Sequence, residues 1–105
     1  GWIVTGYPWY AIKTPAHDAF LKAYQAAYKD YPRLGTIVGY NAIQSLAAGI
    51  RKAGSTDTDK VAEALRSNTF DTPTGNLAFD EKGDLKDFNF VVYEWHQDGT
   101  KTEAK

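Results

Sequence analysis

Aromatic side chains are the residues of this sequence best suited to binding chemistry. Tyr7, Trp9 and Tyr10 cluster around Pro8, and Tyr40 is expected in the first turn of a later helix. Each tyrosine or tryptophan ring combines an apolar face with one polar tip. Loops at strand ends and first turns of helices face the ligand crevices of α/β proteins, and their free N–H groups favour carboxylates. These rings are therefore candidate ligand contacts, and the alternative is that they fill the core.

The two histidines, His17 and His96, are the first candidates for catalysis or metal binding. Neither has a carboxylate–His–Ser grouping or a metal-ligand spacing around it, so surface positions are expected for both. The acidic run after Asp80 resembles a calcium loop, but Leu85 stands where that loop needs glycine. With no cysteine and no phosphate-binding glycine motif, the sequence predicts no enzyme, no metal site and no cofactor.

The length and charge narrow the function classes further. The chain has 105 residues, 43% of them hydrophobic, and a formal net charge of -1, which is typical of one small folded unit. No basic patch predicts nucleic-acid binding, and no apolar run predicts a membrane span. The sequence opens on an apolar β-branched run at Ile3 and Val4, which is typical of a strand already under way. We therefore expect a piece of a larger protein.

Hydrophobic periodicity predicts three helices between two β segments. The capping pair Thr14-Pro15 starts the first helix, and Asp57 starts the third. On the second helix, Ile43, Leu46 and Ile50 are expected to face the core, opposite a polar side. The predicted helices are 15–30, 36–53 and 57–68, and the predicted strands are 2–5, 77–79 and 88–95, with a fourth edge segment at 100–105.

Two motifs near the end of the chain resemble a known family. Residues 72–79 follow a Thr-x-x-Gly-x-Leu-x-aromatic pattern, and residues 80–86 read Asp-Glu-Lys-Gly-Asp-Leu-Lys. An aromatic strand then ends in Trp95-His96-Gln97-Asp98-Gly99. This order closely resembles the extreme C-terminus of bacterial leucine/isoleucine/valine-binding proteins. The earlier blocks, Tyr7-Pro8-Trp9 and Gly39-Tyr40-Asn41-Ala42 among them, fit the same family.

The resemblance implies an α/β fragment of a two-lobe periplasmic binding protein, with about three helices and three or four strands. In such proteins two lobes are joined by crossing segments and close over the ligand. Residues 1–10 would be a second-lobe strand and crossing, residues 14–79 first-lobe helices and a strand, and residues 80–105 a crossing and a second-lobe strand. The chain would thus contribute to both lobes.

The resemblance also implies a function and a set of contacts. The protein would be the periplasmic substrate-binding component of an ABC importer, capturing a branched-chain amino acid or a related small carboxylate. Tyr40 would contact the ligand's side chain, while Tyr7 and Trp9 would shape the mouth of the cleft. Expected partners are the missing N-terminal part of the same protein or a second copy, and the importer's membrane subunits. The alternative is a free-standing carbohydrate- or peptide-binding module that uses its aromatic rings as a platform.

Overall fold

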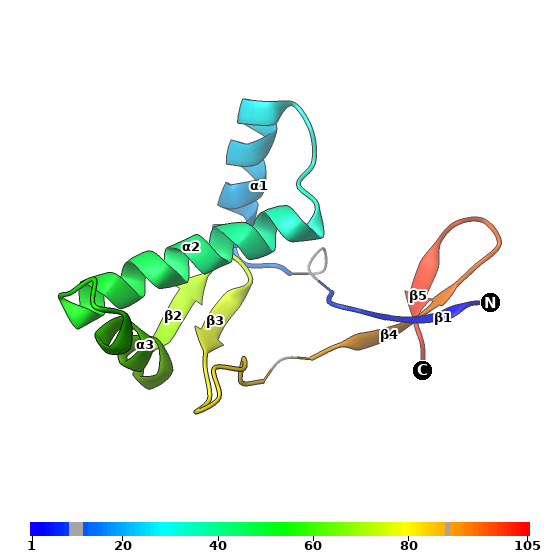
Figure 1. Ribbon diagram of the computed structural model, residues 1–105. Coiled ribbons are helices and arrows are strands. Elements are labelled where there is room, and N and C mark those ends of the chain that lie inside the picture. Colours follow the sequence, from blue (N-terminus) through cyan, green and yellow to red (C-terminus); the bar gives the residue numbers. More distant parts are fainter. Residues whose placement is uncertain (9–11, 88) are drawn as a thin grey trace. The chain divides into compact units, whose positions relative to one another are not determined.

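The computed structural model describes residues 1–8, 12–87 and 89–105, and the chain divides into two compact units. Residues 1–11 and 87–105 form one unit, and residues 12–86 form the other. The predicted α/β class is confirmed, with three helices and five short strands in the described residues (Figure 1). None of the helices in the described ranges is long and apolar enough to span a membrane.

The central unit holds all three helices. They are α1 (Pro15–Tyr28), α2 (Leu34–Ala53) and α3 (Thr58–Ser67). The Thr14 side chain accepts a hydrogen bond from the His17 N–H over 3.1 Å, and Asp57 does the same for the N–H of Lys60 over 3.1 Å. These are the two N-caps that the sequence predicts. Gly54, with φ 61°, ends α2 in the left-handed conformation that glycine adopts without steric cost.

A short hairpin completes the central unit. Strand β2 (Thr69–Thr72) pairs antiparallel with β3 (Gly75–Ala78), and Phe70 lies opposite Leu77. The hairpin packs against α2 and α3, and α2 packs along α3 (Figure 1). The most deeply buried apolar side chains of this unit are Ile37, Val61 and Phe70. Strand β2 is not among the four strand segments that the sequence predicts, so the described residues contain five strands instead of four.

The turn after β3 is held by one carboxylate. Asp80 Oδ1 accepts hydrogen bonds from the N–H groups of Lys82 and Asp84, both over 2.9 Å. Gly83 carries a φ of 92° within this turn. The Asp80 carboxylate therefore stabilises this polar turn.

The second unit is a three-stranded antiparallel sheet with the order β1-β4-β5. Its strands are β1 (Ile3–Gly6), β4 (Val91–Trp95) and β5 (Lys101–Glu103), so the polar tail does form an edge strand. Val4 lies opposite Tyr93, and Tyr93 is the most buried residue of the sheet. The Lys101 ammonium lies 4.5 Å from the centre of the Tyr93 ring, a cation–π distance.

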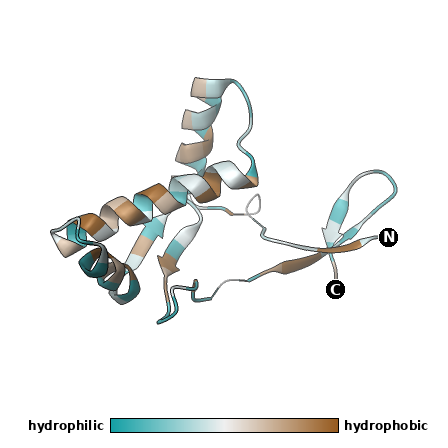
Figure 2. Cartoon of the chain, in the orientation of Figure 1, coloured by the Kyte–Doolittle hydropathy of each residue, from teal (hydrophilic) through white to brown (hydrophobic). Residues whose placement is uncertain are grey.

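The buried face of α2 is the reverse of the predicted one. Asn41, Ser45 and Gly49 are buried, whereas Ile43 and Leu46 are 68% and 44% exposed. A built Cβ at Gly49 would lie 2.8 Å from Leu65 Cδ2, which shows how closely α3 approaches this face. Small and polar residues let α2 and α3 pack closely, whereas Ile43 and Leu46 stay exposed. Figure 2 shows apolar residues distributed along the length of α2.

Candidate functional site

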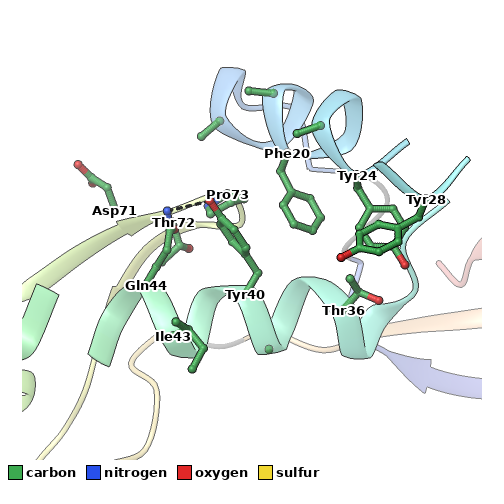
Figure 3. Close-up of a pocket in the computed structure, with 14 residues that line it drawn as sticks. Phe20, Tyr24, Tyr28, Thr36, Tyr40, Ile43, Gln44, Asp71, Thr72 and Pro73 are labelled. Carbon is green, nitrogen blue, oxygen red and sulfur yellow. Dashed lines mark hydrogen bonds between the residues drawn. The ribbon is translucent and has the colours of Figure 1, made fainter. Parts of the chain in front are cut away.

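A pocket of about 900 Å³ lies between α1, α2 and the turn of the β2–β3 hairpin, entirely within the central unit (Figure 3). Its walls are mostly apolar, with a few hydroxyl and amide groups. The lining residues are Ala16, Ala19, Phe20, Ala23, Tyr24 and Tyr28 from α1, Thr36, Gly39, Tyr40, Ile43 and Gln44 from α2, and Asp71, Thr72 and Pro73 from the hairpin.

The hairpin turn holds the start of α1 in place. The Thr14 hydroxyl donates a hydrogen bond to the Pro73 carbonyl over 3.0 Å, while the same oxygen accepts from the N–H of His17. One side chain therefore caps α1 and ties it to a turn 59 residues further along the chain. A capping threonine is visible in sequence, but its second partner is not.

The same turn also holds α2. Asn41 Nδ2 donates to Thr74 Oγ1 over 2.7 Å, and Thr74 Oγ1 lies 3.2 Å from the hydroxyl of Thr72. The Thr72 hydroxyl donates in turn to the Gly75 carbonyl over 2.7 Å. Because Pro73 and Thr74 are adjacent, both helices that form the pocket are fixed to one pair of turn residues.

Aromatic rings form the wall between the helices. The ring of Phe20 lies 4.8 Å from that of Tyr40, and the rings of Tyr24 and Tyr28 are 4.7 Å apart. Phe20, Tyr24 and Tyr28 reach from α1 toward α2, where Tyr40 meets Phe20 and Thr36 lies below the two α1 tyrosines (Figure 3). Such tilted pairs add about 0.5–1.5 kcal/mol each beyond the area they bury.

The polar groups of the pocket come mainly from α2. Gln44 Nε2 donates to the Tyr40 hydroxyl over 3.3 Å, and the buried Gln44 Oε1 has no hydrogen-bond partner in the part of the chain that the structure describes. Thr36 lies in the first turn of α2, where its hydroxyl accepts a hydrogen bond from the Arg33 N–H over 3.4 Å. Among the described residues that line the pocket there is no lysine or arginine. The arrangement suits an apolar or aromatic group and supplies no cation for a carboxylate.

Tyr40, the leading predicted contact, lies in this pocket and is 44% exposed. Its predicted place in the first turn is wrong, because α2 begins at Leu34 and Tyr40 falls in the second turn. Thr36 occupies the first turn instead. Thr36 and Gln44 are not among the predicted site residues, although each lies four residues from Tyr40 on one helix face, and this spacing is the signal that identifies them.

The other predicted contacts belong elsewhere in the chain. Tyr7 follows β1 and is part of the sheet unit, whereas Tyr40 is part of the central unit. Trp9 lies outside the described residues. The structure therefore does not bring the predicted ligand contacts together in one unit.

One histidine is not at the surface position that the sequence predicts. His17 is 2% exposed, and its two ring nitrogens are buried with no hydrogen-bond partner among the described residues. It lies in the first turn of α1, where its N–H donates to the Thr14 hydroxyl. His96 is exposed, as expected, and its Nε2 lies 2.8 Å from the hydroxyl of Thr102.

The sequence and the fold both match known proteins. Residues 1–100 match the sequence pattern of the family described as periplasmic binding protein. The chain is 55% identical over 91 residues to the leucine-, isoleucine-, valine-, threonine- and alanine-binding protein of Pseudomonas aeruginosa, covering 87% of this chain and 24% of the relative. It is 41% identical over 93 residues to the Leu/Ile/Val-binding protein of Escherichia coli K12, covering 89% of this chain and 25% of the relative.

A solved structure shares the fold along the whole chain. The leucine-binding protein of Thermotoga maritima superimposes with a TM-score of 0.76 at 27% identity, covering 100% of this chain and 30% of that one. The chain thus spans about a quarter of the length of the curated relatives that it matches. On this sequence pattern, these identities and this fold, residues 1–105 belong to the periplasmic binding protein family.

Proposed function

We propose that residues 1–105 are part of the substrate-binding component of an ABC importer, which captures a branched-chain amino acid or a related small carboxylate. The observation that carries this proposal is the 55% identity to a protein named for binding leucine, isoleucine, valine, threonine and alanine. Capture is by binding alone, without catalysis. The compartment follows from the family, and we place the protein in the periplasm.

The two lobes of such a protein would each receive part of this chain. We assign residues 1–10 and 80–105 to the second lobe and its crossings, and residues 14–79 to the first lobe. The division of the chain into two compact units, with boundaries at 11–12 and 86–87, supports this assignment. Closure of one lobe on the other would then exclude water from the ligand.

We propose that Tyr40 contacts the side chain of the ligand, with Thr36 beside it, and that Tyr7 and Trp9 shape the mouth of the cleft. The aromatic lining of the pocket around Tyr40 supports contact with an aliphatic or aromatic group. The ligand's carboxylate and ammonium need charged or strongly dipolar partners, because burying an unpaired charge costs several kcal/mol. Those partners come from the rest of the polypeptide, and the loaded protein delivers its ligand to the importer's membrane subunits.

Calorimetry on the full-length gene product tests the proposal. Leucine, valine, benzoate and glucose are titrated separately into the purified protein. Saturable binding of leucine or valine, or of benzoate as the related carboxylate, is the expected result. Binding of glucose alone would overturn the proposal and favour a carbohydrate-binding module. The isolated 105 residues serve as the comparison and should show no saturable binding of leucine.

A further inference from the structure

The turn between β4 and β5 contains the one Asp-Gly sequence of the chain, Asp98-Gly99. Gly99 has a φ of 81°, a left-handed backbone conformation that glycine adopts without steric cost. Its N–H donates to the His96 carbonyl over 3.1 Å, and the His96 N–H donates to the Thr100 carbonyl over 2.8 Å. Hairpin turns of this kind usually place glycine at the left-handed position, so the fold favours glycine directly after Asp98.

Glycine at this position makes the preceding aspartate chemically vulnerable. The backbone nitrogen of Gly99 can attack Cγ of Asp98, because glycine has no side chain to block the approach. A bond forms between this nitrogen and Cγ, and a Cγ–O bond breaks as water leaves with one proton from the nitrogen and one from the carboxyl group. Water then opens the succinimide ring. Where it cleaves the bond between the nitrogen and the original backbone carbonyl, the chain continues through Cγ and residue 98 becomes isoaspartate.

Three hydrogen bonds of the folded turn oppose this reaction. Asp98 Oδ1 accepts from the Thr100 hydroxyl over 2.6 Å and from the Thr100 N–H over 2.9 Å, so the carboxyl group is held toward Thr100. The third bond, from the Gly99 N–H to His96, restrains the nitrogen that would attack.

The charge of the carboxyl group acts in the same direction. Only a protonated carboxyl group loses water readily, because the ionised group has no good leaving oxygen. The Thr100 hydroxyl, and then the Thr100 N–H, lower the pKa of Asp98 below its usual 3.8 by stabilising the ionised form. The reactive protonated form is therefore scarcer in the folded turn than in an open chain.

We propose that Asp98 is a latent site of isoaspartate formation and that the Thr100 hydroxyl keeps it unreactive in the folded protein. Asp98 and Gly99 are both exposed, so burial does not protect them. The protection comes from the hydrogen bonds of the turn. This inference concerns the chemical stability of the chain and does not depend on which ligand the protein binds.

Modification of Asp98 would act on the sheet. Isoaspartate lengthens the backbone between β4 and β5 by one carbon atom. Trp95 lies opposite Lys101, and Tyr93 lies opposite Glu103, directly beyond this turn. The turn type and loop length set the register of a hairpin, so the added atom would disturb the pairing of β5 with β4.

Incubation of the full-length protein in ¹⁸O-labelled water tests the inference. Each opening of the succinimide ring adds one heavy oxygen to residue 98, and mass spectrometry of the digested protein measures it. Folded wild type should react roughly tenfold or more slowly than wild type unfolded in urea. Thr100→Val loses the hydroxyl donor and should react roughly tenfold faster than folded wild type, the effect of losing one hydrogen bond to a charged group.

Thr100→Ser keeps the hydroxyl and should stay at the wild-type rate, while Thr100→Ala removes the same donor in a second variant. Thermal melts show that each variant is folded. Asp59, which is exposed and followed by Lys60, is the internal control and should take up little label.

Three outcomes would overturn the inference. Equal rates in folded Thr100→Val, Thr100→Ala and wild type would refute the role of the hydroxyl. Equal rates in folded and unfolded wild type would show that the turn gives no protection. Absence of label at residue 98 in urea would show that Asp98 is not a latent site. None of these results bears on amino-acid binding, so the proposed function stands or falls separately.

Discussion

Asn41 is 6% exposed and Ile43, two residues later on α2, is 68% exposed, so this helix buries an amide and presents an isoleucine to solvent. The amide is held by a hydrogen bond of 2.7 Å to Thr74. This bond links α2 to the hairpin turn that also receives the Thr14 hydroxyl. The buried polar face is thus part of the framework that fixes α1 and α2 around the pocket.

Breaking that bond should destabilise the central unit. Asn41→Ala is expected to lower the free energy of unfolding by about 1–2 kcal/mol, because it removes a buried hydrogen bond and leaves Thr74 without this donor. Urea denaturation of Asn41→Ala, Thr74→Ala and the double variant measures the coupling between the two side chains. Asn76→Ala, on the exposed side of β3, is the control and should be near neutral. Strictly additive effects of the two single changes would refute the coupling.

Two glycines of α2 should respond oppositely to the same substitution. Gly49→Ala brings a methyl group to within about 2.8 Å of Leu65 Cδ2 and 3.0 Å of its Cγ, so Leu65 must shift. We expect a loss of about 1–2 kcal/mol of stability from overpacking. Gly35→Ala has no atom within 4 Å and should be neutral or stabilising by up to about 1 kcal/mol through helix propensity. Thermal unfolding of the two variants decides between these signs, and a stabilised Gly49→Ala would show that α2 and α3 have room to separate.

Truncating Tyr40 should affect ligand binding far more than stability. In the full-length protein, Tyr40→Ala is expected to weaken leucine binding by about 1–3 kcal/mol, the range for loss of a buried aromatic contact. The melting temperature should change little, because the ring is 44% exposed and its neighbour Phe20 stays in place. Tyr31→Ala, at a tyrosine 67% exposed and outside the pocket, is the matched control. An unchanged dissociation constant for Tyr40→Ala would place this ring in a purely structural role.

The carboxyl group of Asp98 should titrate at unusually low pH. The Thr100 hydroxyl donates to Asp98 Oδ1 over 2.6 Å and lowers the pKa of Asp98 below its usual 3.8, with a further contribution from the Thr100 N–H over 2.9 Å. Because the folded-state pKa lies below the unfolded one, the stabilising contribution is present above about pH 4 and is lost as the pH falls through the folded-state value. Carboxyl carbon NMR should show the pKa rising in Thr100→Val, which loses the hydroxyl donor. A pKa that stays the same in this variant would contradict the assigned cause.

Features set by neighbouring residues were predictable from the sequence. The Thr14-Pro15 start of α1, the Asp57 cap of α3 and the Gly54 end of α2 depend on local backbone chemistry, and all three are confirmed. The fold class and family followed from motifs that lie close together in the chain. Strand β2 was missed because it has only four residues, one of them the strand-disfavouring Asp71, and its only partner in the described structure is β3.

Features set by distant residues were not predictable in the same way. The spacing of Ile43 and Leu46 predicts that this apolar face of α2 is buried. It does not predict that residues 1–105 bury the opposite face of the helix and leave Ile43 and Leu46 exposed. The hydrogen bond between Thr14 and Pro73 joins residues 59 positions apart, and no local pattern predicts it. The pocket follows from the same long-range bonds, so Tyr40 could be nominated from sequence while its partner Phe20 could not.

The pairing of β1 with β4 has a consequence for the order of folding. Val4 lies opposite Tyr93, so this ladder closes a loop that contains the whole of residues 12–86. Closing a loop of this length in an unfolded chain costs entropy that grows with the logarithm of the loop length. If residues 12–86 fold first, β1 and β4 are already closer together when they pair, and this cost is smaller. The helices can fold from contacts close in sequence, whereas the sheet has to wait for both ends of the chain to be available. Within residues 1–105, the β1–β4 ladder therefore cannot form during synthesis until residues 12–86 and then Val91–Trp95 have been made.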